Sequence, residues 1–399
     1  MSCCRELDIK SSGELKELFK LMGVNPGGMN IMIPKGRFRT ILLKELKPVP
    51  ANILKQECLA VGAECALHQR SITHEVDTTD ALIMATDDQY LRIINHLQRQ
   101  PFGISSIGKK LDTLIFETVN NHVKLAHGKT LDLSRGTIVM GVLNLTPDSF
   151  SDGGSYTTKE SALRRAEEMI REGAGIIDAG GESTRPGASD VPVGEEMDRI
   201  IPIVEGLKDI SPVISVDTAK PDVAEAALKA GAHIINDIFG FRKNQRMARI
   251  VNRYGAGAVL MHIQGTPRTM QENPRYRDVI GEILGVLEES VQIAIDEGIT
   301  KDHLIIDPGI GFGKDLRHNL DILLYLREFL ALKIPVLVGA SRKSFIEKID
   351  GSHVMERLGG SLAAAVTSVL NGASILRVHD IKETVQAVKV IDEMKRNRA

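Results

Sequence analysis

The chain has 399 residues, which suits two domains and allows a large hydrophobic core without disulfide bonds or a structural metal. Lys and Arg number 50 against 52 Asp and Glu, a formal net charge of -2, and Trp is absent. This balance argues against a basic nucleic-acid-binding surface, and an aromatic content of 4% supplies few platforms on which bases could stack.

Membrane and secreted proteins are also disfavoured. The sequence has no run of about 18 apolar residues, so no transmembrane helix is expected. Met1–Lys10 lacks the apolar core of a signal peptide. The four cysteines, Cys3, Cys4, Cys58 and Cys65, do not form the dense, spread pattern of a secreted disulfide scaffold. We therefore expect a cytoplasmic protein with neither a membrane nor a nucleic-acid partner.

Residues 1–130 alternate helical and extended patterns, which predicts a small α+β domain. Helices are expected over 14–21, 51–61 and 89–97, and strands over 29–33, 40–43 and 81–84. Cys58 and Cys65 would lie on one helix face near His68. Buried thiols are favoured there over a metal site, because no Cys-x-x-Cys pair is present.

The role of residues 1–130 stays open at this stage. A packing or dimer-supporting domain is the simplest interpretation, and a regulatory or substrate-channelling domain is the alternative.

Residues 131–399 have a different pattern, in which apolar strand-like runs alternate with amphipathic helical segments. The eight runs cover 138–145, 176–179, 213–216, 233–235, 258–261, 304–306, 336–338 and 375–378. Such alternation predicts parallel β-α units, and eight of them match a (β/α)8 TIM barrel. A doubly wound open sheet is the competing fold, but no Gly-x-Gly-x-x-Gly turn follows the first run.

In a barrel of this kind, the chemistry lies at the carboxyl ends of the strands. The ends of the last two strands, where this fold commonly holds phosphate, carry Ser341, Arg342, Lys343, Arg377 and His379. Arg can bind phosphate oxygens in a bidentate manner, while Lys and His add positive charge and donors. A phosphorylated or pyrophosphorylated substrate is therefore expected, with a solvated basic loop as the alternative.

A second group at the strand ends comprises Asp217, Asn236, Asp307 and Lys343. These side chains could pair with the donors and acceptors of a planar heterocycle. The alternative is a buried Asp–Lys ion pair that holds the strand ends together. The segment Gly309–Lys314 resembles half of a nucleotide-binding loop, but Asp315 stands where such a loop requires Ser or Thr.

Two segments carry a specific resemblance. Residues 140–154, MGVLNLTPDSFSDGG, and 178–187, DAGGESTRPG, are similar to the two signatures of the dihydropteroate synthase family. Shorter matches follow in order at 215–218, 235–238, 260–262, 307–309, 339–344 and 377–379. The resemblance covers residues 131–399 and leaves the first 130 unexplained.

The resemblance implies a transferase of folate synthesis. Members join 6-hydroxymethyl-7,8-dihydropterin pyrophosphate to 4-aminobenzoate, which gives 7,8-dihydropteroate and pyrophosphate. It also implies a homodimer. Two rival functions remain: a pterin-binding methyltransferase barrel, which would not need the whole diphosphate-binding set, and a catalytically inactive barrel used as a binding scaffold.

The resemblance also assigns residues. Asn144 would bind Mg2+ carried on the diphosphate, and Arg377 and His379 would hold the diphosphate itself. Asp217, Asn236, Met261, Asp307 and Lys343 would hold the pterin. The 4-aminobenzoate pocket would comprise Thr184, Arg185, Pro186, Phe312 and Ser341, with Asp148, Phe150 and Asp152 in a loop that orders over both substrates. Lys343, Arg377, His379 and Asp152 are the expected catalytic residues.

Overall fold

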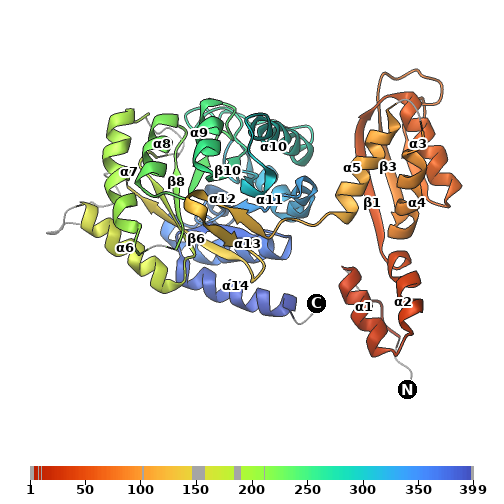
Figure 1. The fold of residues 1–399 in the computed structure, drawn as a ribbon, viewed down its shortest axis with the longest axis horizontal. Helices are drawn as coiled ribbons and strands as arrows, with labels where there is room; N and C mark the ends of the chain where they lie inside the picture. Colours follow the sequence, from red (N-terminus) through yellow and green to blue (C-terminus); the bar gives the residue numbers. More distant parts are fainter. Residues whose placement is uncertain are drawn as a thin grey trace. The chain divides into compact units, whose positions relative to one another are not determined.

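The structure, a computed structural model, describes residues 4–7, 9, 11–100, 103–145, 158–183, 190–210 and 212–396. The chain divides into two compact units, Met1–Thr118 with Lys395–Ala399, and Val119–Met394 (Figure 1). The expected boundary at residue 130 stays a prediction. No helix in the described ranges is long and apolar enough to cross a membrane.

The amino-terminal unit is a three-stranded antiparallel sheet with helices. Its strands are β1 (Phe38–Leu46), β2 (Glu64–Leu67) and β3 (Thr79–Thr86), in the order β1-β3-β2. Its helices are α1 (Ser12–Leu21), α2 (Pro26–Met32), α3 (Pro48–Ala60), α4 (Asp87–Leu97) and α5 (Ile104–Phe116). Alternate strand residues such as Ile41 and Ile83 pack with α3, α4 and α5 into one core. Within it, the buried Tyr90 hydroxyl donates to the Ile83 carbonyl at 3.0 Å.

Two predictions for this unit were wrong. Residues 29–33 belong mostly to helix α2, because Pro26 occupies its first turn and the Asn25 side chain accepts from the Gly27 amide at 2.9 Å. Cys65 lies in strand β2, because the left-handed Gly62 (φ 73°) ends the turn after α3. The thiols of Cys58 and Cys65 are both buried. The pKa of Cys58 is raised, chiefly by its hydrogen bond with Cys65 and also by burial.

The second unit is built on a sheet of eight parallel strands. They are β6 (Ile138–Asn144), β7 (Ile176–Gly180), β8 (Ile214–Asp217), β9 (Ile234–Asp237), β10 (Gly257–Met261), β11 (Leu304–Asp307), β12 (Leu337–Val338) and β13 (Ile375–Val378). From β6 to β11 each strand pairs with the next along the chain, β12 pairs with β13, and β13 pairs with β6. A bridge from Ile306 to Val336 joins β11 to the segment before β12. The sheet therefore closes into the predicted (β/α)8 barrel.

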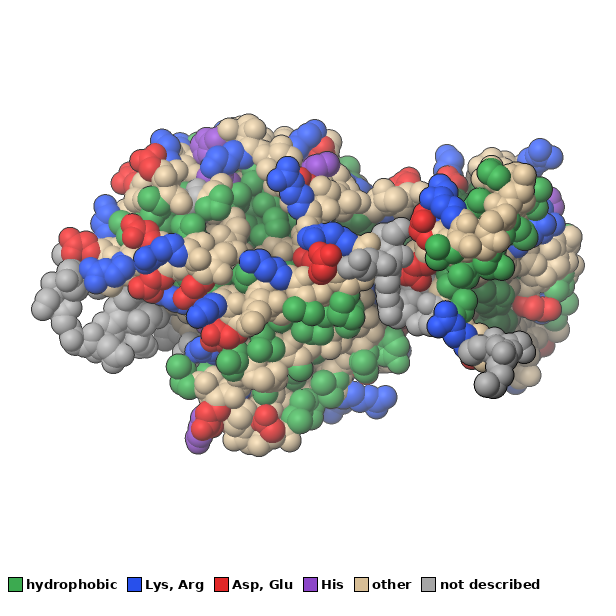
Figure 2. All heavy atoms as spheres, turned by 90° about the horizontal axis from the view of Figure 1, so that it is seen from below, with side chains coloured by type: hydrophobic (Ala, Val, Ile, Leu, Met, Phe, Trp, Pro, Cys, Tyr) green, Lys and Arg blue, Asp and Glu red, His purple; other side chains and the backbone are tan. Residues whose placement is uncertain are grey.

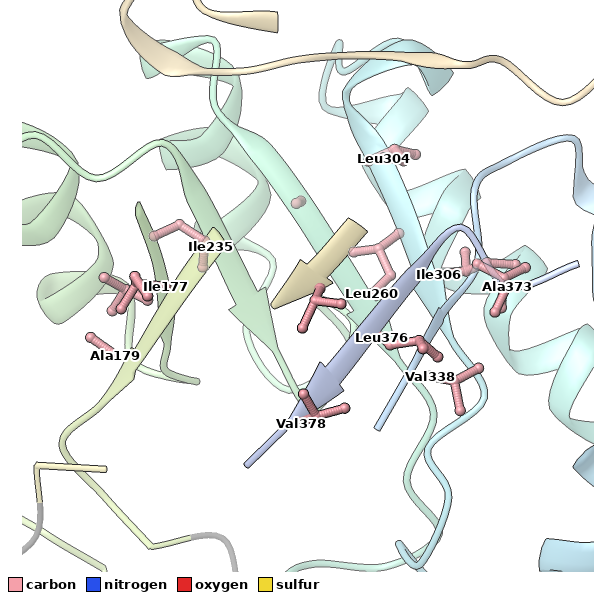
Figure 3. Close-up of a cluster of buried hydrophobic side chains, with 14 of the residues drawn as sticks. Ile177, Ala179, Ile235, Leu260, Leu304, Ile306, Val338, Ala373, Leu376 and Val378 are labelled. Atoms are coloured by element: carbon pink, nitrogen blue, oxygen red, sulfur yellow. The ribbon is translucent and has the colours of Figure 1, made fainter. Parts of the chain in front are cut away.

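Helices connect the strands. They are α6 (Thr158–Glu172), α7 (Val193–Leu207), α8 (Pro221–Ala230), α9 (Arg246–Tyr254), α10 (Val279–Asp296), α11 (Leu316–Leu324), α12 (Ser344–Asp350), α13 (Leu358–Leu370) and α14 (Ile381–Arg396). One set of alternate strand residues, including Ile177, Ile235 and Leu376, belongs to the core that the strands form with these helices (Figure 3). Successive strand side chains point to opposite faces, so the other set lines the barrel interior.

A hairpin closes the amino-terminal end of the barrel. Its strands β4 (His122–Lys124) and β5 (Thr130–Asp132) are antiparallel. The hairpin residues Val123, Leu125, Leu131 and Leu133 form one apolar cluster with inward-facing strand residues. These partners are Met140, Ile176, Val213, Ile234, Val259, Ile305, Leu337 and Ile375. The hairpin thus seals the end of the barrel opposite to the predicted site.

The last helix is tied to the start of the first barrel strand. The Asp392 carboxylate in α14 accepts from the Thr137 amide at 2.8 Å and from its hydroxyl at 3.2 Å. Gly136 has φ 137°, and a Cβ there would lie 2.4 Å from the Asp392 Oδ2 atom. This position therefore requires glycine, because the carboxylate occupies the space of a side chain.

Candidate active site

Side-chain parity along the strands positions the candidate site. Ile176, Ile234, Ile305 and Ile375 face inward at the sealed end. Two residues further along each strand, at the same side-chain parity, stand Asp178, Asn236, Asp307 and Arg377. The interior therefore changes from an apolar layer to a polar layer over one two-residue step, at the end where barrel enzymes carry their chemistry.

Arg377 is the centre of this polar layer. Its Nε donates to Asp178 Oδ2 at 2.6 Å, and its terminal amine donates to Asp217 Oδ2 at 2.8 Å. The Asn236 amide also donates to Asp178 Oδ2, at 3.2 Å. One guanidinium thus joins strands β13, β7 and β8, and it brings the two predicted groups of site residues into direct contact.

Burial perturbs the charges of this group. Burial raises the pKa of Asp217 to about 7, against the opposing effect of Arg377, and the Asp178 carboxylate raises it further. Burial alone would lower the pKa of Arg377, but the carboxylates of Asp178 and Asp217 raise it above its ordinary value. The guanidinium therefore stays charged, whereas Asp217 titrates near neutral pH.

Asp307 ends β11 and begins a glycine-rich loop. Its Oδ1 atom accepts from the Gly309 amide at 2.7 Å. Burial raises the pKa of Asp307 to about 6, while this amide, Lys343, Lys314 and Arg377 lower it. Gly309 has φ +70°, and a Cβ there would lie 2.0 Å from the His262 carbonyl oxygen, so the close turn requires glycine.

Phe312 and Lys343 meet across the barrel mouth. The Lys343 ammonium lies 4.1 Å from the centroid of the Phe312 ring, which is a cation-π distance. Met261, at the end of β10, belongs to the same small apolar cluster as Phe312. The expected pterin-binding Lys343 and Met261 therefore both associate with Phe312, which was assigned to the 4-aminobenzoate pocket.

Ser341 and His379 form a pair after β12 and β13. The Ser341 hydroxyl accepts from the His379 amide at 3.2 Å and lies 3.2 Å from its Nδ1. Burial, followed by the charges of Arg377, Arg342 and Lys343, lowers the pKa of His379 to about 4. This low pKa favours the neutral imidazole, which can donate and accept hydrogen bonds, and a positive charge on His379 stays a prediction for the diphosphate-bound site.

Arg342 holds the backbone between Ser341 and Lys343. It is left-handed at φ 56°, which is uncommon for a residue with a side chain. Its Nε donates to Asp380 Oδ2 at 3.0 Å, and its amide donates to the Ser361 hydroxyl at 2.9 Å. These bonds offset the cost of the left-handed backbone and fix the residues on either side.

A cavity of about 530 Å3 lies beside the polar layer. Its lining includes Asp217, Thr218, Lys220, Lys243 and Arg268. The Lys220 ammonium donates to the buried Glu196 at 2.5 Å, to Glu182 at 2.8 Å and to the Val191 carbonyl at 2.7 Å. This network ties helix α7 to the ends of strands β7 and β8.

Some predicted residues lie outside the described ranges. These are Asp148, Phe150, Asp152, Thr184, Arg185 and Pro186. Asn144 is the last residue of β6, half-buried and in register with Gly180 of β7. Among the described residues, no group of three His, Cys, Asp or Glu side chains could hold a metal by itself. A lone amide oxygen fits a Mg2+ ion whose other ligands come from phosphate and water.

Asp178 was missed as a site residue, although its motif was recognised. It is fully buried, and its Oδ1 atom has no hydrogen-bond partner. The alternation of side chains along a strand could have identified it, because Asp178 and Gly180 are two residues apart and so share the inward face of β7. No pattern in the sequence predicts the contact between Lys220 and Glu196, because the two residues belong to different helix–strand units.

Comparison with known proteins agrees with this geometry. The sequence pattern of the family described as "Pterin binding enzyme" matches residues 140–379. The dihydropteroate synthase of Escherichia coli K12 is 49% identical over 268 residues, which are 67% of this chain and 94% of that protein. The probable bifunctional folylpolyglutamate synthase/dihydropteroate synthase of Halobacterium salinarum is 38% identical over 388 residues, 97% of this chain and 46% of that protein.

Solved structures give the same result. The Xanthomonas albilineans dihydropteroate synthase with 4-aminobenzoic acid has a TM-score of 0.65 and 42% identity, covering 69% of this chain and 98% of that one. The Burkholderia cenocepacia enzyme complexed with 7,8-dihydropteroate has a TM-score of 0.63 and 38% identity, covering 70% and 99%. The barrel and its polar rim thus define a pterin-binding transferase. The chain belongs to the pterin binding enzyme family and, within it, to the dihydropteroate synthases.

Proposed function

We propose that the protein condenses 6-hydroxymethyl-7,8-dihydropterin diphosphate with 4-aminobenzoate, which gives 7,8-dihydropteroate and pyrophosphate. The observation that carries this proposal is the buried polar layer in which Arg377 contacts both Asp178 and Asp217. Such a layer at the carboxyl end of a barrel provides acceptors for a heterocycle beside a cation for a diphosphate. The family membership supports the same reaction.

Two carboxylates and an amide recognise the pterin. Asp217 and Asp307 accept from its ring and amino N–H groups, and Asn236 pairs with a neighbouring donor and acceptor. Lys343 donates to the carbonyl oxygen or a ring nitrogen of the pterin, and Met261 packs against the ring face. Because these groups are buried, a ligand without the matching polar edge would leave them unpaired at a large free-energy cost.

The leaving diphosphate is stabilised by Arg377, with hydrogen bonds from His379 and Ser341. Asn144 would hold the Mg2+ that the diphosphate carries, and this ion would neutralise part of the leaving charge. The geometry of Arg377 matters because a guanidinium can switch one donor from Asp217 to phosphate while it keeps its bond to Asp178. The electrostatic field then favours departure of the anion.

We propose that the C–O bond breaks before the new C–N bond forms. The pterin ring can delocalise the developing methylene cation, and 4-aminobenzoate needs no base because its aniline nitrogen is already unprotonated. Rapid quench with an unreactive analogue of 4-aminobenzoate tests this order. Pyrophosphate release in its presence is expected, and complete absence of C–O cleavage would contradict it.

Pyrophosphate release from the pterin diphosphate, measured with and without 4-aminobenzoate, tests the reaction itself. Sustained release over many turnovers is expected only when both substrates are present. A pterin-binding methyltransferase would bind folates without releasing pyrophosphate, and an inactive scaffold would bind without turnover. Either result would reject the proposed reaction.

We further propose a cytoplasmic homodimer. Exposed hydrophobic residues on helices α11 and α13 support an interface: Leu324 is 61% exposed and Leu370 is 46% exposed. The two helices adjoin, since the Asn371 amide after α13 donates to the Leu323 carbonyl of α11 at 2.8 Å. Figure 2 shows hydrophobic side chains gathered on one face of the barrel unit. Sedimentation velocity of the wild type and of Leu324→Asp tests this assembly, which predicts a dimer and a monomer respectively.

A further inference from the structure

Lys314 is buried beneath the glycine-rich loop 309–313 and has no role in the mechanism above. It is 1% exposed, which is rare for lysine. Its ammonium contacts His262 Nδ1 at 2.9 Å, the Phe312 carbonyl at 2.9 Å and, more weakly, the His262 carbonyl at 3.5 Å. The two carbonyl oxygens accept, and the imidazole Nδ1 also accepts in the tautomer that carries its proton on Nε2, which together match the three donors of an ammonium group.

These contacts fasten the loop to the end of strand β10. Gly309, Gly311 and Gly313 are all left-handed, at φ +70°, +81° and +68°. The chain therefore folds tightly over Lys314, and two features of the site depend on the result. The Gly309 amide points at Asp307 Oδ1 at 2.7 Å, and the Phe312 ring lies 4.1 Å below the Lys343 ammonium.

The charges around Lys314 favour a cation beside a neutral imidazole. Burial lowers the pKa of Lys314, and Lys343 adds to this, while Asp307 opposes it. When the His262 proton is on Nε2, all three neighbours are acceptors, and an ammonium satisfies them whereas a neutral amine would aim its lone pair at one of them. Burial and the charges of Lys314 and Arg242 lower the pKa of His262 to about 2, so this imidazole stays neutral and does not repel the ammonium.

We infer that Lys314 is a positioning residue for pterin binding. Its ammonium holds loop 309–313 against His262 and helps keep Asp307 ionised as a hydrogen-bond acceptor for the pterin. Lys343 and Arg377 are the other cations that face Asp307, and both also serve the substrates. The contacts described for Lys314 are all with protein atoms, so its electrostatic effect on Asp307 does not depend on whether the substrates are bound. This inference rests on the proposed function.

The test compares Lys314→Met with wild type and with Lys389→Met, an exposed lysine of helix α14. Lys314→Met leaves the buried Phe312 and His262 carbonyls without this donor, so the melting temperature should fall, and binding is compared at a temperature where all the proteins are folded. Binding of 6-hydroxymethyl-7,8-dihydropterin, measured by calorimetry, should weaken by about tenfold, the effect of about 1.4 kcal/mol. The acid limb of this binding should move to higher pH by roughly one unit, because Asp307 loses a neighbouring cation.

Lys389→Met should bind the pterin as wild type does, and Lys314→Arg should keep the acid limb near its wild-type position because the charge is retained. A folded Lys314→Met with unchanged affinity and an unchanged acid limb would overturn the inference. Should Lys314→Met fail to fold, His262→Leu decides, since it removes one acceptor of the ammonium. Weaker pterin binding supports the inference there, and wild-type binding overturns it.

Failure of the proposed function would look different from failure of this inference. If wild-type protein neither bound the pterin nor released pyrophosphate, the reaction itself would be rejected before any variant was compared. If wild type bound and turned over while Lys314→Met behaved identically, only the role of Lys314 would be rejected.

Discussion

At the amino-terminal end of the barrel, inward-facing residues such as Ile176 and Ile375 pack on the hairpin β4–β5. Two residues along the same strands, Asp178 and Arg377 form a buried ion pair at 2.6 Å. Both layers are formed by inward-facing side chains of the same strands, yet one end of the barrel is apolar and the other is charged. The contrast suggests that the sealed end stabilises the barrel, so that the open end can carry buried charges that contribute little to stability.

The largest expected effect comes from the open end. Lys343→Ala should lower kcat/KM for pyrophosphate release by about 10- to 100-fold, because it removes a charged hydrogen-bond donor that holds the pterin. Lys343 is partly exposed, so the melting temperature should change little. Steady-state kinetics and thermal unfolding of the same preparation measure both quantities. A loss of activity only in proportion to a loss of folded protein would contradict the separation of the two ends.

The matching experiment at the sealed end is Leu131→Ala in the hairpin. Leu131 is 5% exposed, and its truncation should lower the free energy of unfolding by about 2–4 kcal/mol. Values of kcat and KM should stay at wild-type levels, because no substrate contact is lost. Val390→Ala on exposed α14 is the control and should change stability by less than about 0.5 kcal/mol. A large change in KM for Leu131→Ala would show that the two ends are coupled.

The pH dependence of activity sharpens the same contrast. Burial raises the pKa of Asp217 to about 7 and that of Asp307 to about 6. A raised carboxyl pKa means that the acceptor form is lost as pH falls through these values. We expect kcat/KM to fall on the acid side of neutrality, approaching about tenfold per pH unit. A profile that stays flat from pH 5.5 to 8.5 would contradict this expectation, because it would mean that the pKa values of Asp217 and Asp307 both lie well below 5.5.

The smallest effect is expected from the amino-terminal unit. Removal of residues 1–118, which leaves the hairpin in place, should change kcat/KM by less than about twofold, because a compact unit can fold alone. Removal of residues 1–130 is the contrast, since it deletes β4 and exposes the apolar end of the barrel. Thermal unfolding should separate the two truncations. Equal stability would contradict the sealing role of the hairpin.

The barrel could be predicted from the sequence because its signals are local and repeated. Each strand is an apolar run bounded by polar residues, and the eight runs agree closely with the observed strands. The amino-terminal unit was predicted less well because Met29, Ile31 and Ile33 alternate as in a strand, whereas the Asn25–Pro26 start favours helix α2. The hairpin was missed because three-residue strands are too short to show a period.

The candidate site residues were predicted from motifs, but their mutual contacts were not. The bond from Arg377 to Asp178 spans 199 residues, and no local pattern shows that a guanidinium will choose that carboxylate. The lowered pKa of His379 and the burial of Lys314 also depend on packing from several strands. Sequence therefore indicated which groups are present, while the fold determines which of them are charged and paired.

The contact between Thr137 and Asp392 has a consequence for synthesis of the protein. Thr137, just before the first barrel strand, bonds to a carboxylate that lies 255 residues later in the chain. Because the ribosome makes the chain from its amino end, this contact forms only after all eight strands have been synthesised. A chain that stopped just before Asp392 would keep the paired strands β13 and β6 but would leave the Thr137 amide without this partner.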